Sequence, residues 1–317
     1  MKPPASFVLI VTGPTASGKS ALATDAALEF NGVVINGDSM QVYGELNILS
    51  ARPSTDDMAR VPHRLFGVLA ATETCSAGRW TAMAKAEIEA AWDRGLLPII
   101  TGGTGLYLKA LITGLVSIPA IPDAVRREAR ELLRRLGPEA FREELRKLSP
   151  QDAERIPASD PQRLARAFEV VKATGRELSQ WQDMPAAPPL PQAEFAAVVL
   201  TPPRADLYAA IDARFDRMIA AGALDEARSL MGADKDLPAM KALGASELLA
   251  HLEGLLTLAE AVEKAKRASR NFAKRQLTWL RHQDIGCRAE TYSAQYSESI
   301  KADIFSFIRN SLLTTQS

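Results

Sequence analysis

Residues 13–20 read Gly13-Pro14-Thr15-Ala16-Ser17-Gly18-Lys19-Ser20. This is the pattern of a phosphate-binding loop (P-loop), in which a glycine and four free positions precede Gly-Lys-Ser/Thr. The flanks also fit, because residues 7–11 are an apolar run suited to a buried strand and residues 20–30 are typical of a helix. The glycines let the backbone curl around an anion, Lys19 adds a positive charge, and the Ser20 hydroxyl can bind Mg²⁺. We therefore predict that all eight residues hold a di- or triphosphate; the alternative is an ordinary glycine-rich turn.

The composition is that of a globular protein. The chain has 317 residues, 47% apolar and 24% charged, which suits about two domains with a substantial core. Basic and acidic residues number 38 each, so any surface for a polyanion has to be local. Cys75 and Cys287 are too few for a disulfide framework or a zinc site, which suggests a reducing compartment. With no signal peptide and no apolar stretch of about twenty residues, we expect a cytoplasmic protein with no membrane partner.

The segments around the P-loop predict an α/β fold. Further strand patterns and one amphipathic helix pattern occur along the chain, at residues 32–36, 64–69, 96–100 and 195–200 for the strands and 76–94 for the helix. A strand, a phosphate loop, a helix and a second strand open a doubly wound parallel sheet of the P-loop NTPase-like kind. Such sheets bind ligands at the carboxyl ends of their strands.

Two features lie at such strand ends. Asp38 follows the strand at 32–36, where it could hold Mg²⁺, accept a proton or only cap the next turn. The second glycine-rich loop, residues 101–107, follows the strand at 96–100 and is a plausible second wall of one site. That strand ends in Thr-Gly-Gly, without the Asp with which ATPases of this class hold Mg²⁺ and position water. The P-loop therefore suits a leaving group better than nucleotide hydrolysis.

The middle of the chain predicts a helical insertion. Helix patterns at 123–136, 138–148 and 161–173 follow one another with no strand between them. We divide the chain into a first part of the core at 1–117, a helical insertion domain at 118–192, and a last part at 193–317 that completes the core and adds C-terminal helices. The helix that starts at Asp160 carries Gln162, Arg163 and Arg166 on its first turns, where they could reach a backbone phosphate.

The last part of the chain carries a basic helix. Residues 205–231 are predicted as one helix with Arg214 and Arg217, and residues 260–281 as a longer one. The longer helix has Glu263 as a neighbouring acid and seven cations: Lys264, Lys266, Arg267, Arg270, Lys274, Arg275 and Arg281. With Phe272 and Trp279 interleaved, this pattern favours contact with nucleic acid, the alternative being a solvated surface helix. The sequence after Arg288 predicts no particular structure.

Several motifs, in their order along the chain, resemble those of the tRNA dimethylallyltransferase family (tRNA isopentenyltransferases or IPP transferases). Besides the P-loop they are Asp-Ser-Met-Gln-Val-Tyr (38–43), Pro-His-Arg-Leu (62–65), Ser-Ala-Gly (76–78), Gly-Gly-Thr-Gly-Leu-Tyr (102–107), Asp-Pro-Gln-Arg-Leu-Ala-Arg-Ala-Phe-Glu-Val (160–170) and Ala-Lys-Arg-Gln-Leu-Thr-Trp-Leu-Arg (273–281). They span nearly the whole chain, and their combination is far more specific than any one of them. The chain lacks the Cys/His zinc module of eukaryotic members, which favours the bacterial type.

The resemblance implies a reaction and a cofactor. A dimethylallyl group would pass from its diphosphate to N6 of the adenosine at tRNA position 37, next to the anticodon, giving N6-isopentenyladenosine and diphosphate. By the same resemblance Asp38 is the general base, Thr104 orients the amine or the diphosphate, and Arg214 holds the diphosphate. The P-loop would cradle the leaving group, with Mg²⁺ on Ser20.

The resemblance also implies contacts with tRNA. The adenine is flipped out of its loop in this family, and Asp38, Ser39, Met40, Gln41 and Thr104 would contact it here. The backbone of the tRNA would be held by further residues: Arg126, Gln162, Arg163, Leu164, Ala165, Arg166, Lys274 and Arg275. We expect tRNA and dimethylallyl diphosphate as partners of a monomer.

The chain departs from the family pattern at a few positions. Ala210 stands where many members have Arg, Ala245-Ser246 replaces Tyr-Lys or Tyr-Arg, Cys75 replaces Tyr, and Ser159 replaces a common Asn. The first two changes could weaken contacts with diphosphate or tRNA. Alternative functions are prenyl transfer to free AMP or ADP, phosphate transfer from ATP to a small molecule, and RNA binding without catalysis.

Overall fold

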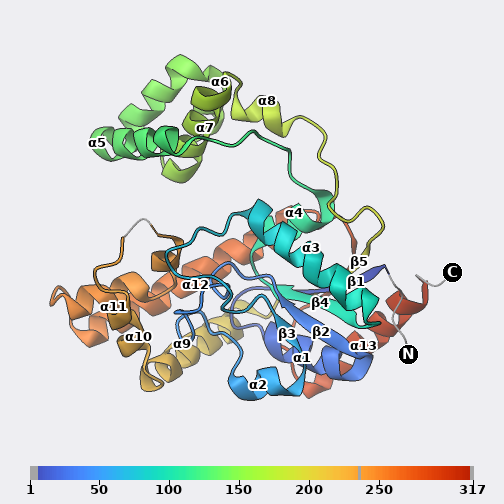
Figure 1. The fold of residues 1–317 in the computed structure, drawn as a ribbon. Coiled ribbons are helices and arrows are strands. Elements are labelled where there is room, and N and C mark those ends of the chain that lie inside the picture. Colours follow the sequence, from blue (N-terminus) through green and yellow to red (C-terminus); the bar gives the residue numbers. More distant parts are fainter. Residues whose placement is uncertain (1–5, 235–236, 315–317) are drawn as a thin grey trace. The chain divides into compact units, whose positions relative to one another are not determined.

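The computed structural model describes residues 6–234 and 237–314, and within them the strands form one six-stranded parallel sheet in the order β3-β2-β4-β1-β5-β6 (Figure 1). The strands are β1 Phe7–Thr12, β2 Gly32–Asn36, β3 His63–Arg64, β4 Leu97–Gly102, β5 Glu194–Leu200 and β6 Arg288–Tyr292. The central strands β1 and β4 are buried along their whole length. This confirms the predicted parallel α/β sheet.

Helices cover both faces of the sheet, because alternate residues of each strand point to opposite sides. From β1, Val8 and Ile10 join a cluster with residues of α3 (Ala77–Asp93) and α4 (Gly105–Thr113). Phe7, Leu9 and Val11 join a second cluster with residues of α1 (Lys19–Phe30) and α13 (Glu298–Thr314). The sheet is therefore doubly wound.

The core has further helices besides those that cover the sheet. They are α2 Thr55–Arg60, α9 Arg204–Ala220, α10 Ala223–Ser229, a 3₁₀ turn at Pro238–Lys241, α11 Ala245–Leu252 and α12 Leu258–His282. Helix α12 begins with a capping box, in which the Thr257 hydroxyl accepts from the Glu260 N–H and the Glu260 carboxylate accepts from the Thr257 N–H.

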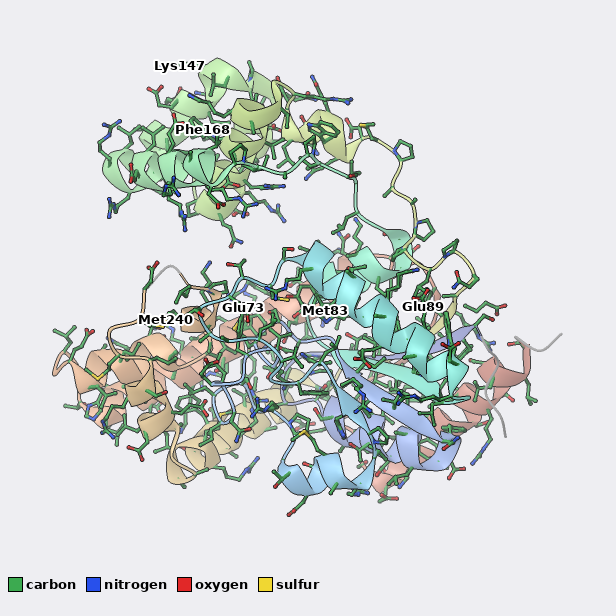
Figure 2. The ribbon with its side chains drawn as sticks, viewed as in Figure 1. Glu73, Met83, Glu89, Lys147, Phe168 and Met240 are labelled. Carbon is green, nitrogen blue, oxygen red and sulfur yellow. The ribbon has the colours of Figure 1, made fainter. Side chains whose placement is uncertain are left out.

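The chain divides into two compact units, residues 1–113 with 188–317 and residues 114–187. The second unit consists of α5 Asp123–Leu148, α6 Pro150–Arg155, α7 Pro161–Thr174 and α8 Leu178–Gln182. Gly137 interrupts α5 with a φ of 77°. Phe168, which is labelled in Figure 2, packs against Phe141 with ring centroids 5.3 Å apart, so this unit has an apolar core of its own.

Two predictions of local structure are corrected, and a segment without a prediction proves to be ordered. The strand expected at 64–69 is confined to His63–Arg64, because Leu65 and Gly67 adopt positive φ values and end the pairing. The single helix expected at 205–231 is two helices, since Gly222 has a φ of 101° between α9 and α10. The sequence after Arg288 forms β6 and α13; β6 is a largely exposed edge strand and carries no apolar pattern.

No helix in the described ranges, 6–234 and 237–314, is long and apolar enough to cross a membrane.

Candidate active site at the carboxyl edge of the sheet

The P-loop joins β1 to α1, as predicted. Ala16 and Gly18 have φ values of 64° and 90°, so the chain turns sharply before Lys19 starts the helix. A side chain at Gly13 would lie 2.6 Å from the Leu200 carbonyl oxygen, which explains the glycine there. The loop therefore presents the N-terminus of α1 to the carboxyl edge of the sheet, where an anion is favoured.

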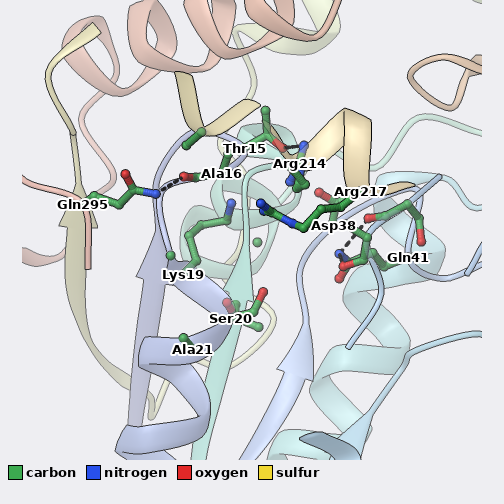
Figure 3. A pocket seen from close by; sticks show the side chains of 16 residues that line it. Thr15, Ala16, Lys19, Ser20, Ala21, Asp38, Gln41, Arg214, Arg217 and Gln295 are labelled. Carbon is green, nitrogen blue, oxygen red and sulfur yellow. Dashed lines mark hydrogen bonds between the residues drawn. The ribbon is translucent and has the colours of Figure 1, made fainter. Parts of the chain in front are cut away.

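A pocket of about 280 Å³ opens beside this loop (Figure 3). Its wall comes from five parts of the core: the P-loop, the segment after β2, the end of β4, α9 and the segment before α13. The side chains that line it include Thr15, Lys19, Ser20, Asp38, Gln41, Thr101, Ala210, Arg214, Arg217 and Gln295. The structure thus brings Asp38 and Arg214 together with the P-loop, although they are far apart in the sequence.

Two partly buried cations face one carboxylate in this pocket. Arg214 donates from Nη2 to the Thr15 hydroxyl at 2.6 Å, while Lys19 donates from Nζ to the Pro14 carbonyl at 3.0 Å. Burial lowers the pKa of Lys19 to about 8; Asp38 opposes that shift and Arg214 adds to it. Burial also lowers the pKa of Arg214, again opposed by Asp38. A bound anion would relieve both cations of this desolvation cost.

Two residues that line the pocket each have a buried polar atom without a hydrogen bond in the described part of the chain. Within residues 6–234 and 237–314, Arg214 Nε and Thr101 Oγ1 have no hydrogen-bond partner. Buried polar groups are rarely left unpaired, because the lost hydrogen bond costs about 1–3 kcal/mol. A polar ligand in the pocket would supply the partners.

Asp38 is held by its own turn. Its Oδ1 accepts from the Met40 N–H at 2.9 Å, and its N–H donates to Asn36 Oδ1 at 2.8 Å. Asp38 therefore does cap the next turn. Its second carboxylate oxygen has no hydrogen-bond partner in the described part of the chain, and the residue lines the pocket. Capping and chemistry are compatible here, because they use different oxygens.

Thr104 links the second glycine-rich loop to the Asp38 segment. Its hydroxyl accepts from the Ser39 N–H at 3.0 Å. Gln41 donates from Nε2 to the carbonyl oxygens of Ser50 and Ala51, both at 3.0 Å, so only its amide oxygen is left for a ligand. Met40 packs partly buried against the core. The residues predicted to contact the adenine therefore lie next to one another in the structure. They differ in how many of their polar atoms are left for a ligand.

Sequence reasoning missed three residues that hold the P-loop. Gln276 of α12 accepts from the Thr15 N–H at 2.8 Å. Gln295 donates to the Ala16 carbonyl at 3.0 Å, and the Tyr296 N–H donates to the Ser17 carbonyl at 3.2 Å. The motif at 273–281 marked Gln276 without assigning it a role; nothing local marks Gln295 or Tyr296.

The basic helix α12 is less free than its sequence suggests. Arg270 donates to both carboxylate oxygens of Asp212 at 2.6 Å, and Lys266 pairs with Asp216 at 2.7 Å. These two cations join α12 to α9, which corrects their assignment to a nucleic-acid surface. Lys274 and Arg275 are exposed and line a shallow groove with Asn271, Thr278, Trp279, His282 and Gln283.

The helical unit, taken by itself, exposes most of its predicted contacts. Arg126, Gln162 and Arg163 are exposed, and Arg166 lies beside Glu169 at 3.4 Å. Ala165 is half-buried. The side chain of Leu164 is fully buried in the apolar core of this unit, so only its backbone is left for the predicted contact with RNA.

Two positions at which the chain departs from the family pattern lie in different environments. Ala210 lines the pocket one turn before Arg214, so its small side chain leaves room there. Ala245 is fully buried at the start of α11. Ala245 therefore has no direct route to a ligand, whereas Ala210 has one.

Comparison with known proteins gives one family. The family profile described as IPP transferase matches residues 41–283. The tRNA dimethylallyltransferase of Paramagnetospirillum magneticum is 53% identical over 308 residues, covering 96% of this chain and 97% of the relative. That of Rhodospirillum rubrum is 51% identical over 316 residues, covering 98% and 97%.

Solved structures give the same result. The tRNA isopentenylpyrophosphate transferase of Bacillus halodurans aligns with a TM-score of 0.70 and 32% identity, over 99% of this chain and 98% of its own. A eukaryotic dimethylallyltransferase described as acting on tRNA aligns with a TM-score of 0.76 and 26% identity, over 96% of this chain and 80% of its own.

The pKa of Lys19 predicts how the pocket binds an anion. The free pocket holds Lys19 protonated below about pH 8, and a bound polyanion favours that protonated form. Above pH 8 binding has to take up a proton, so affinity falls. Between pH 7 and 9.5, binding of inorganic diphosphate without divalent metal should weaken roughly 10- to 30-fold by calorimetry. Lys19→Met should bind weakly and keep only the pH dependence that comes from ionisation of the diphosphate itself, and a wild-type profile parallel to that of the variant would contradict the assignment.

Proposed function

The chain belongs to the IPP transferase family, the tRNA dimethylallyltransferases, and we propose that it transfers a dimethylallyl group from dimethylallyl diphosphate to N6 of the adenosine at tRNA position 37. One observation carries the proposal: Lys19, Arg214 and Asp38 line one pocket on the P-loop. No acid ends β4, whose last residues are Thr101 and Gly102. The pocket therefore fits a diphosphate leaving group better than it fits a nucleotide that water hydrolyses.

The cations of the pocket act on the leaving group. As the bond between the allylic carbon and the diphosphate oxygen breaks, the electron pair stays on the oxygen and its negative charge grows. Lys19, Arg214 and the N-terminus of α1 are already in place for that charge, so little reorganisation is needed during the reaction. Stabilisation that grows with the developing charge lowers the barrier itself.

Asp38 acts on the acceptor. The exocyclic amine of adenine is a weak nucleophile, so a base has to take its proton as the new N–C bond forms. The Asp38 oxygen that is not engaged by Met40 is the candidate, and its turn is fixed by Asn36. Thr104 lies beside this turn through its hydrogen bond with Ser39 and would orient the amine.

The oxygen donors of the pocket fit Mg²⁺. Ser20 is exposed at the start of α1 and lines the pocket together with Asp38 and Thr101. Hydroxyl and carboxylate oxygens are ligands that Mg²⁺ prefers, and it commonly keeps phosphate oxygens and water as its other ligands. We propose Ser20 as the protein ligand; bound there, the ion would offset part of the charge of the diphosphate.

Exposed cations support the contact with tRNA. Lys274 and Arg275 point from α12 to solvent, with Trp279 in the same groove. In the helical unit, Arg126, Arg163 and the neighbouring residues Gln162, Ala165 and Arg166 of α7 remain proposed contacts. Such residues suit the phosphate backbone of the anticodon stem-loop, whose unpaired adenine costs little to flip out.

Replacing Asp38 tests the base. Asp38→Asn keeps an oxygen for the Met40 N–H and cannot take a proton, so we expect single-turnover transfer to fall about 10²- to 10⁴-fold. Binding of tRNA and of dimethylallyl diphosphate should stay within about threefold, because the substitution keeps the size of the side chain and its hydrogen bond with the Met40 N–H. Asp93→Asn, an exposed position on α3, is the matched control and should leave the rate unchanged. Normal turnover by Asp38→Asn would remove the assignment.

The salt dependence of binding tests α12. Replacing Lys274 and Arg275 together by Ala should weaken tRNA binding at low salt and reduce the slope of log Kd against log salt by about 1 to 2. Arg94→Ala is the control, because Arg94 is exposed between α3 and β4, at the amino edge of the sheet. An unchanged slope in the double variant would return this face of α12 to a purely solvated role.

A further inference from the structure

Gln276 touches both glycine-rich loops with one side chain. Its Oε1 accepts from the Thr15 N–H of the P-loop at 2.8 Å, and its Nε2 donates to the Gly103 carbonyl at 3.0 Å. The residue is 7% exposed. It reaches the loops from the last third of α12, 261 residues along the chain from Thr15.

The two contacts require a group that accepts and donates at once. The Thr15 N–H can only donate and the Gly103 carbonyl can only accept, so the orientation of the amide is fixed. An ionised carboxylate at this position would have no proton for Gly103 and would repel its carbonyl oxygen. A side chain without polar atoms would leave both backbone groups unpaired in a buried place.

The loops meet α12 at very short range. A Cβ at Gly103 would lie 2.1 Å from Gln276 Nε2, and one at Gly105 would lie 2.3 Å from the Trp279 ring. On either side of Gln276, Ala273 and Leu277 are buried in a cluster with Leu207 and Ile211 of α9. The amide is therefore mounted on a packed helix and not on a mobile loop.

Next to its contact with Gln276, each loop has a threonine that is linked to a residue of the proposed reaction. The Thr15 hydroxyl accepts from Arg214, which faces the diphosphate side. Thr104, next to Gly103, accepts from the Ser39 N–H beside Asp38, on the acceptor side. The amide thus lies between the group that holds the leaving group and the group that orients the nucleophile.

We propose that Gln276 is a positioning residue, which sets the separation between the diphosphate-binding loop and the loop that orients the acceptor amine. This inference rests on the proposed function. It also implies that the Thr15 N–H is committed to Gln276 and is not one of the amides that bind phosphate.

Gln276→Glu and Gln276→Ala test the proposal. At pH 8 both should lower kcat/KM for dimethylallyl diphosphate roughly 30- to 100-fold, because a misplacement of about 1 Å costs that much in rate. The Kd for tRNA should change less than about twofold, since Gln276 is buried. Gln192→Glu, an exposed position that makes the same chemical change, should behave as wild type.

The pH dependence separates positioning from general damage. A protonated Glu again offers a carbonyl that accepts and a hydroxyl that donates, and burial beside a carbonyl oxygen favours protonation. The ratio of Gln276→Glu to wild-type activity should therefore rise at least severalfold from pH 8 to 6, while the ratio for Gln276→Ala stays flat. Melting curves at both pH values normalise each rate to the folded fraction.

Three results would overturn the proposal: wild-type kcat/KM in both variants, equal and flat ratios for both, or losses that vanish after normalisation. If the wild-type chain transferred nothing to tRNA, the proposed function would fail separately. Binding of inorganic diphosphate would then decide the inference alone, with roughly tenfold weaker binding by Gln276→Ala supporting it and unchanged binding overturning it.

Discussion

Burial of two cations beside a single carboxylate is the constraint on which the site depends. Lys19 and Arg214 are partly removed from water and Asp38 offsets only part of that cost, so their pKa values are lowered. Such an arrangement is costly in the free protein and favourable once a polyanion enters. A diphosphate that gains negative charge as it leaves is the ligand that this pocket stabilises most strongly during reaction.

The sheet and its C-terminal helices keep the cations in place. Because β4 and β1 are neighbours, the two glycine-rich loops leave the same edge of the sheet side by side. Helix α9 brings Arg214, α12 bridges the loops through Gln276, and the segment before α13 holds the carbonyls of Ala16 and Ser17. The P-loop is thus supported mainly by residues far along the chain, which explains why a short local motif needs the whole core around it.

The sequence predicts those parts of the fold that short local patterns determine. The P-loop, β1, β2, β4 and the turn at Asp38 follow from apolar runs and glycine positions within short windows. Pairings between distant segments cannot be predicted from such local patterns. The ion pair of Arg270 with Asp212 does not follow from the number of charges along α12, and β6 has no apolar face that would predict a strand. Leu164 was placed among RNA contacts by its motif, although its place on the apolar side of α7 buries it. Gln276 belongs to a sequence motif, but only the folded structure shows that it contacts Thr15 and Gly103.

One measurement tests the central claim most directly. The wild-type chain is incubated with radiolabelled dimethylallyl diphosphate, Mg²⁺ and bulk tRNA, with parallel tubes that hold AMP in place of tRNA, or labelled ATP in place of the prenyl donor. The account predicts label in tRNA alone, on the N6 of adenosine after digestion to nucleosides. Label in AMP would make the acceptor a free nucleotide, and phosphate transfer from ATP would show that the pocket serves a nucleotide after all; either result would contradict the account.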